Sequence, residues 1–194
     1  DEQVRRSAVA SALEEAEQHL RAGEDDEAEV ALGKAEAGLR DDGPDDLRER
    51  LRELRDVQTL ARTLDDIRLD SATWVDGKFD RASALRDYAL AFAEMGLDLD
   101  ADTAEVWAKR LRDSVIRDRL ANALDHWALT AHDERHRKLR DRLLTLGRAV
   151  GARGGSGDRL VWEEVHRAEN WRDPSDLIAK VHSGKLEPHS PLLI

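Results

Sequence analysis

Two histidines at helical spacing are the side chains in this sequence whose types and positions come nearest to a metal site. His132 and His136 belong to the segment His-Asp-Glu-Arg-His, so a helix would present both imidazoles on one face. The zinc-protease motif needs glutamate directly after the first histidine, and Asp133 occupies that position here. No third ligand is evident nearby. We therefore predict a polar helix start, with no metal and no cofactor.

The other patterns that resemble catalytic motifs lack their essential parts. The glycine-rich segment 151–157 has no preceding strand and no Gly-Lys-Ser/Thr ending, so it predicts a flexible loop and not a phosphate cradle. The carboxylate pairs Asp65-Asp66 and Glu163-Glu164 are adjacent, so their side chains point in different directions on a helix. We predict that the chain is not an enzyme.

Basic residues gather between positions 109 and 148, a segment with 11 Lys and Arg residues but only 6 Asp and Glu residues. A run of charge is usually a solvated helix face. The alternative hypothesis is a docking patch for an acidic surface, and this chain's own segment 1–70 is one candidate for that surface. The densest part of this patch consists of Arg135, Arg137, Lys138, Arg140 and Arg142.

Aromatic residues are few and all lie at or after Trp74. Trp74, Phe79, Tyr88 and Phe92 could line a ligand groove, but their helical or turn spacing favours a hydrophobic core. The excess of acidic residues lies before this point, because segment 1–70 holds 21 acidic residues against 11 basic ones. We expect one part over 1–70 and a second over 71–194.

The composition predicts an all-α fold. Charged residues make up 38% of the chain and aromatic residues only 4%, which suits exposed helices and not a β-sandwich. The net charge of −11 argues against nucleic acid as a partner. No apolar run is long enough to span a membrane, so we expect no insertion by this segment. The absence of cysteine is typical of a reducing compartment, and we expect a cytoplasmic protein.

Apolar periodicity and turn residues place the helices. Gly23 separates the first two, Gly96 is expected at a C-cap, residues 102–105 form a capping-box pattern, and Ser114 is expected to cap the next helix. The predicted helices are about 4–21, 26–40, 45–71, 80–95, a short one after 102, 115–131, one opened by Asp133, 158–169 and 174–183.

The first two helices carry Ala16, Ala28, Leu32 and Ala35 at the packing positions of a tetratricopeptide (TPR) hairpin. The third carries an apolar seam that can pack within the chain or pair two chains in a homodimer. The seam consists of Leu47, Leu51, Leu54, Val57, Leu60, Leu64 and Ile67. After it we expect a compact bundle around Trp74, Phe92, Trp107 and Trp127.

Four segments together resemble a region of large bacterial serine/threonine protein kinases that carry C-terminal TPR arrays. They are residues 12–39 (ALEEAEQHLRAGEDDEAEVALGKAEAGL), 43–80 (with its most specific part from Leu64 to Asp80), 88–129, and the ending EPHSPLLI at 187–194. The resemblance implies a segment between the kinase domain and the TPR repeats. No kinase motif can be carried over, because the sequence has no glycine-rich loop after a strand, no His-Arg-Asp and no Asp-Phe-Gly.

We therefore expect a non-catalytic spacer or protein-interaction segment of a larger, kinase-linked signalling protein, with a truncated TPR start at the end of 71–194. Its partners would be another protein or neighbouring domains of the same chain. Two alternatives remain open: a self-associating module, and a regulatory segment that modulates an attached kinase domain.

Overall fold

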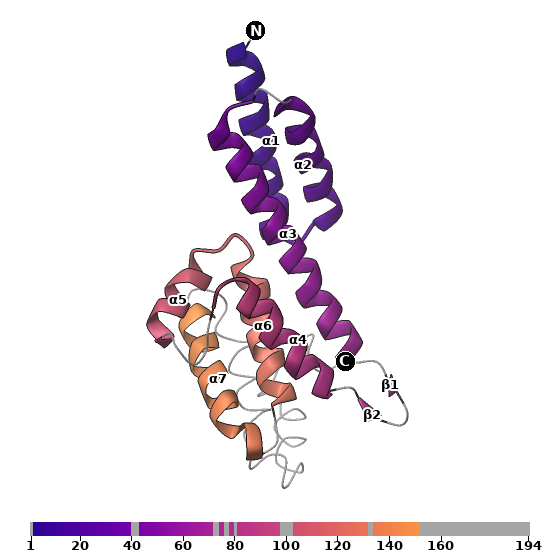
Figure 1. Ribbon diagram of the computed structural model, residues 1–194, viewed down its shortest axis with the longest axis vertical. Helices are drawn as coiled ribbons and strands as arrows, with labels where there is room; N and C mark the ends of the chain where they lie inside the picture. The colour runs from indigo at the N-terminus through magenta and orange to yellow at the C-terminus, as the bar shows by residue number, and fades with distance from the viewer. Residues whose placement is uncertain are drawn as a thin grey trace, which may run out of the picture. The chain divides into compact units, whose positions relative to one another are not determined.

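Helix-favouring residues fill most of the chain, and the described part of the structure is helical almost throughout (Figure 1). The computed structural model describes residues 2–39, 43–71, 74–75, 78–79, 81–97, 103–131 and 134–151. Its elements are α1 (Glu2–Ala22), α2 (Asp25–Leu39), α3 (Asp45–Ser71), β1 (Trp74–Val75), β2 (Lys78–Phe79), α4 (Arg81–Glu94), α5 (Ala104–Arg112), α6 (Arg117–Thr130), the 3₁₀ turn η1 (Glu134–His136) and α7 (Arg137–Gly151). The predicted all-α class is confirmed.

Helices α1 and α2 form a tight hairpin around a glycine turn. Gly23 has a φ of +80°, in the left-handed region that glycine enters at little cost. Its N–H donates to the Leu20 carbonyl at 3.3 Å, and the Glu24 N–H donates to the His19 carbonyl at 2.9 Å. These two bonds satisfy the last carbonyls of α1 and reverse the chain into α2.

Small side chains let α1 and α2 approach closely. The buried residues on their facing sides are Val9, Ala12, Leu13, Ala16, Leu20, Ala28, Ala31, Leu32, Ala35 and Leu39. They include all four positions that the sequence suggested for a TPR hairpin. The two helices pack on each other and both pack on α3. A helical hairpin is present, and its kinship with TPR units stays a prediction.

The long helix α3 is shared by two groups of helices. It packs on α1 and α2, and it also packs on α4 and α6 of the second group (Figure 1). With 27 residues it is about 40 Å long. Four seam residues, Leu47, Leu54, Leu64 and Ile67, are buried along it, together with Gln58 and Ala61.

The second group, α4 to α7, surrounds an aromatic core. Phe92 of α4 stacks on Trp127 of α6, with ring centroids 5.4 Å apart and planes 11° apart. Trp107 of α5 lies 6.2 Å from Phe92 on another side, and Tyr88 lies 6.1 Å from Trp127. All four rings are at most 2% exposed. The predicted core roles of Phe92, Trp107 and Trp127 are confirmed.

Helix ends differ from the sequence expectation in two places. The N-cap of α5 is Thr103, and its side chain makes no capping hydrogen bond, so the predicted capping box is wrong in register and in bonding. Helix α6 starts at Arg117, so Ser114 is not its N-cap. Ser114 instead stabilises the preceding turn, because its Oγ accepts the Ile116 N–H at 3.3 Å. Gly96, with a φ of +70°, does end α4 as predicted.

A short antiparallel pair, β1 with β2, was not predicted. Trp74 pairs with Phe79 and Val75 with Lys78, on either side of the sequence Asp76-Gly77, which is favoured in two-residue hairpins. All described residues belong to one compact unit, residues 1–151. None of their helices is both long and apolar enough to cross a lipid bilayer.

Several expectations lie outside the described residues. They concern the helices predicted at 158–169 and 174–183, the glycine-rich loop after Gly151, the ending at 187–194, and the side chains of Trp74 and Phe79.

Candidate functional site at the junction of the two helical groups

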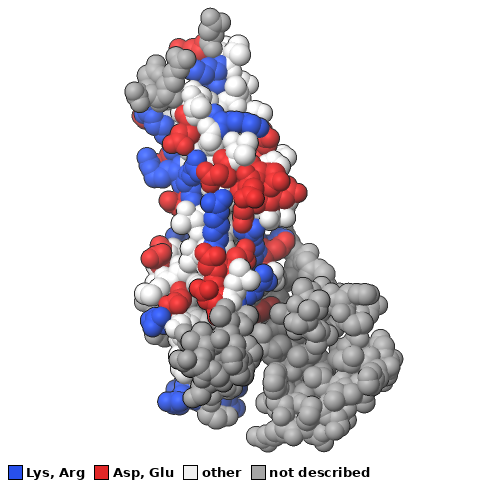
Figure 2. All heavy atoms as spheres, turned by 90° about the vertical axis from the view of Figure 1, so that its right-hand side faces the viewer, with Lys and Arg blue, Asp and Glu red and all other residues white. Residues whose placement is uncertain are grey.

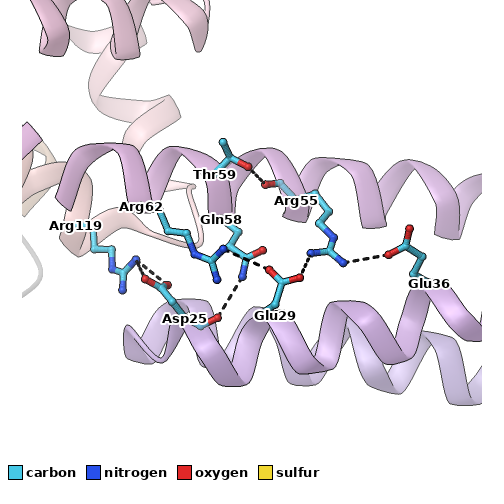
Figure 3. Close-up of polar contacts among 8 residues, drawn as sticks. All are labelled: Asp25, Glu29, Glu36, Arg55, Gln58, Thr59, Arg62 and Arg119. Atoms are coloured by element: carbon cyan, nitrogen blue, oxygen red, sulfur yellow. Dashed lines mark hydrogen bonds and ion pairs between the residues drawn. The ribbon is translucent and has the colours of Figure 1, made fainter. Parts of the chain in front are cut away.

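A row of polar side chains on α3 faces α2 (Figure 3). Arg55, Gln58 and Arg62 recur at intervals of three and four, so one side of the helix presents all of them. Arg55 donates to Glu29 and, at 3.1 Å, to Glu36. Arg62 forms an ion pair with Glu29 at 3.5 Å. One α2 carboxylate is therefore held by two α3 guanidiniums.

Gln58 is the buried member of this row. It is 3% exposed, and its Nε2 donates to the Asp25 carbonyl at 3.2 Å. A buried amide that loses its partner is costly, so this bond fixes the register of α3 against the first turn of α2. Thr59 does not add to it, because its hydroxyl donates within α3 to the Arg55 carbonyl at 2.9 Å.

The ion pairs shift the ionisation of their members in the stabilising direction. The hydrogen bond from Arg55 lowers the pKa of Glu29, and the same bond raises the pKa of Arg55. Both groups are partly exposed, so each pair contributes little energy by itself. Figure 2 shows acidic and basic side chains interleaved over one face of the protein.

Arg119 of α6 joins the second group to the hairpin. Its Nη1 lies 2.9 and 3.0 Å from the two carboxylate oxygens of Asp25, and its Nη2 donates to the Gly23 carbonyl at 3.1 Å. Asp65 of α3 lies 3.7 Å away. Only 18% of the Arg119 side chain is exposed, so this contact is better shielded from water than the other pairs.

A partly buried chain of polar contacts links α3, α4 and α6. Ser71 donates from Oγ to the Arg68 carbonyl at 2.7 Å, and Nε2 of His126 lies 3.3 Å from the same Oγ. The Tyr88 hydroxyl lies 3.0 Å from Nδ1 of His126. Because the serine hydrogen is already used, Nε2 carries the imidazole hydrogen and Nδ1 accepts from Tyr88.

This chain of contacts favours a neutral imidazole. Burial, and to a smaller extent the positive charge of Arg68, lower the pKa of His126 to about 4. Burial also raises the pKa of Tyr88. A serine that donates to a backbone carbonyl cannot pass that hydrogen to His126, so the arrangement suits a structural link better than a nucleophile.

The five basic residues suggested as a docking patch lie on η1 and α7. Arg135, Arg137 and Lys138 are exposed, whereas Arg140 and Arg142 are half-buried. Helix α7 packs mainly on α5 and α6. Arg119, which the sequence did not single out, forms ion pairs between region 109–148 and segment 1–70, with Asp25 and Asp65. Docking by the patch stays a prediction.

The remaining candidates are the aromatic residues suggested for a groove and the two histidines suggested for a metal site. Tyr88 and Phe92 are buried core residues, as predicted, and His136, the last residue of η1, is half-buried. His132 lies outside the described residues. Among the residues that the structure describes, no group of three His, Asp or Glu side chains is placed to hold a metal ion.

The junction residues carried weak sequence signals. Gln58 could have been noticed, because it interrupts the apolar stripe of the third helix between Leu54 and Ala61. Arg119 and His126 look like ordinary polar residues of an amphipathic helix. No protein family model, no curated protein and no solved structure matches this chain.

Proposed function

We propose that this chain is a non-catalytic helical spacer and protein-interaction segment, which holds the elements attached to its two helical groups in a fixed relative orientation. The observation that supports this proposal most directly is the sharing of α3. A single 27-residue helix contributes buried side chains along its length, and α1, α2, α4 and α6 all pack on it.

The polar contacts support a fixed orientation, because they act across the junction. Arg119 binds Asp25, and the Ser71–His126–Tyr88 chain ties the end of α3 to α4 and α6. Packing alone allows a helix to slide or rotate by a residue. Paired buried polar groups select one register, because other registers leave them without partners.

Pulsed electron paramagnetic resonance on spin-labelled protein tests this proposal. The native chain has no cysteine, so Val30→Cys on α2 and Val106→Cys on α5 give two unique labelling sites. Both side chains are exposed, at 59% and 55%. We expect one narrow distance distribution, which broadens when Arg119→Ala is added. A broad distribution without that change would contradict a rigid spacer.

The kinase-linked setting is supported by the sequence resemblance alone. A spacer predicts that deleting residues 1–194 from a kinase that contains them leaves the turnover of a short peptide substrate unchanged. The regulatory alternative predicts that turnover changes. Comparing the two proteins at equal kinase concentration distinguishes these hypotheses.

A further inference from the structure

A groove of about 740 Å³ runs beside α3, bounded by α4 and by residues at and after the end of α5. Its apolar lining includes Val57 and Leu60 of α3 and Met95 just after α4. All three side chains are half-buried. The fold therefore covers much of the α3 seam but leaves part of it accessible along this groove.

The rim of the groove is acidic. Exposed carboxylates of Glu53, Asp56 and Glu94 line it, and within the described residues none of them has an ion-pair partner. The other two carboxylates there are neutralised, since Glu17 pairs with Arg21 and Arg50, and Asp113 pairs with Lys109. Arg110 also lines the groove; it donates to the Gly96 carbonyl and has no ion-pair partner among the described residues, so an excess of two negative charges flanks the apolar floor.

The walls of the groove determine the kind of backbone that can bind. Helices α3 and α4 use their backbone groups internally, so they offer an extended peptide no strand edge to pair with. A helix satisfies its own backbone and can insert an apolar face between two helices. The lining residues of α3 run from Arg50 to Thr63, a rise of about 20 Å, which corresponds to nearly four turns.

We propose that this groove binds an amphipathic helix of a partner protein, about 14 residues long, whose apolar stripe is flanked by Lys and Arg. The apolar stripe packs on Val57, Leu60 and Met95, and the basic side chains pair with Glu53, Asp56 and Glu94. This proposal deepens the proposed interaction function and depends on it. It assigns that function to one surface and one class of ligand.

Fluorescence anisotropy tests the proposal with the full chain and two labelled 14-residue probe peptides. One peptide is a designed amphipathic helix with a leucine stripe and flanking lysines, and the other carries glutamates in place of the lysines. The test variant combines Glu53→Lys, Asp56→Lys and Glu94→Lys. The control combines Glu14→Lys, Asp66→Lys and Asp70→Lys, which make the same charge change at exposed positions outside the groove lining.

We expect the lysine peptide to bind the native chain saturably and the glutamate peptide to bind more weakly. The test variant should bind the lysine peptide about tenfold more weakly and should prefer the glutamate peptide. The control variant should change the affinity for the lysine peptide by no more than about twofold. Methyl NMR of the native chain should show chemical-shift changes at Leu60 and Met95 when the lysine peptide binds. This measurement locates the binding site without using the variants. Circular dichroism confirms that both variants are folded.

Three outcomes would overturn the proposal. They are no saturable binding of the lysine peptide, equal weakening by both variants, and a concentration-dependent dimer of the native chain that the test variant abolishes. The last outcome would assign the groove to a second copy of the chain. The distance measurement between Val30→Cys and Val106→Cys needs no peptide. It therefore tests the spacer function separately from peptide binding in the groove, and failure of one proposal can be told from failure of the other.

Discussion

The guanidinium of Arg119 contacts both carboxylate oxygens of Asp25, at 2.9 and 3.0 Å, across 94 positions of sequence. The two residues lie in different helical groups, and both side chains are about four-fifths buried. Asp25 also lies in the first turn of α2, where the helix dipole favours a negative charge. One ion pair therefore connects the hairpin turn, the start of α2 and the second group.

Arg119→Ala should lower the free energy of unfolding by about 1–2 kcal/mol, because it leaves Asp25 and the Gly23 carbonyl without their shared donor. A double-mutant cycle with Asp25→Ala, measured by urea unfolding, should give a coupling of about 1 kcal/mol. The control is Arg52→Ala, which removes the highly exposed pair with Glu49 and should change stability by less than about 0.5 kcal/mol. A coupling near zero would show that the Arg119–Asp25 pair does not help to hold the two groups together.

Acidification should destabilise the protein through His126. Its pKa is about 4 in the folded chain, below the ordinary value of 6.5, so the unfolded chain binds a proton first. The stabilisation from the neutral imidazole is complete above pH 6.5 and is lost progressively as the pH falls towards 4. The loss should be on the order of 2 kcal/mol, since partial exposure reduces the full linkage effect.

The measurement is urea unfolding at several pH values for the native chain and for His126→Gln, which has no titrating imidazole at this position. Other acidic groups titrate in both proteins and therefore cancel in the difference. The native chain should lose more stability between pH 6.5 and 4 than the variant. If the unfolding free energies of the two proteins fall equally with pH, His126 is as easily protonated in the folded chain as in the unfolded chain.

Phe92→Ala should cost about 3–4 kcal/mol, because the ring contacts both Trp127 and Trp107 in the centre of the second core. Leu90→Ala is the matched control on the same helix, since Leu90 is 56% exposed and should change stability by less than about 0.5 kcal/mol. Urea unfolding followed by tryptophan fluorescence measures both. Similar losses from the two variants would place Phe92 outside the main core.

Two glycines of α2 should respond in opposite ways to alanine. A Cβ at Gly33 meets no heavy atom within 4 Å, so Gly33→Ala should raise the melting temperature and stabilise by about 0.5–1 kcal/mol. A Cβ at Gly38 would lie 2.6 Å from Cγ2 of Val9, so Gly38→Ala should be destabilising. Adding Val9→Ala should recover part of that loss. Failure of this rescue would place the strain elsewhere.

Local patterns were sufficient to predict the helices but not how they meet. The periodicity of the apolar residues and the turn residues located the ends of the first four helices to within about two residues. This was possible because an apolar helix face and a glycine turn each depend on only a few neighbouring residues. The seam on α3 was visible for the same reason. Its partners were not, since the same stripe suits an intramolecular or an intermolecular contact.

The junction illustrates what sequence alone could not provide. The sequence emphasised a dense basic run on η1 and α7, whereas Arg119, from a sparser stretch, contacts segment 1–70. Whether an arginine is solvated or buried against a distant carboxylate depends on tertiary packing and not on neighbouring residues. The Ser71–His126–Tyr88 chain was missed similarly, because its members come from three helices.

The sharing of α3 has a consequence for how the protein opens. Neither group can lose this helix and keep its own interior intact, so the hairpin and the aromatic bundle should unfold together as one cooperative unit. Backbone amides in α1 and in α6 should then exchange their hydrogens with deuterium at rates governed by the same global opening. A force applied to one group would reach the other through a continuous helix, so pulling should rupture both at once.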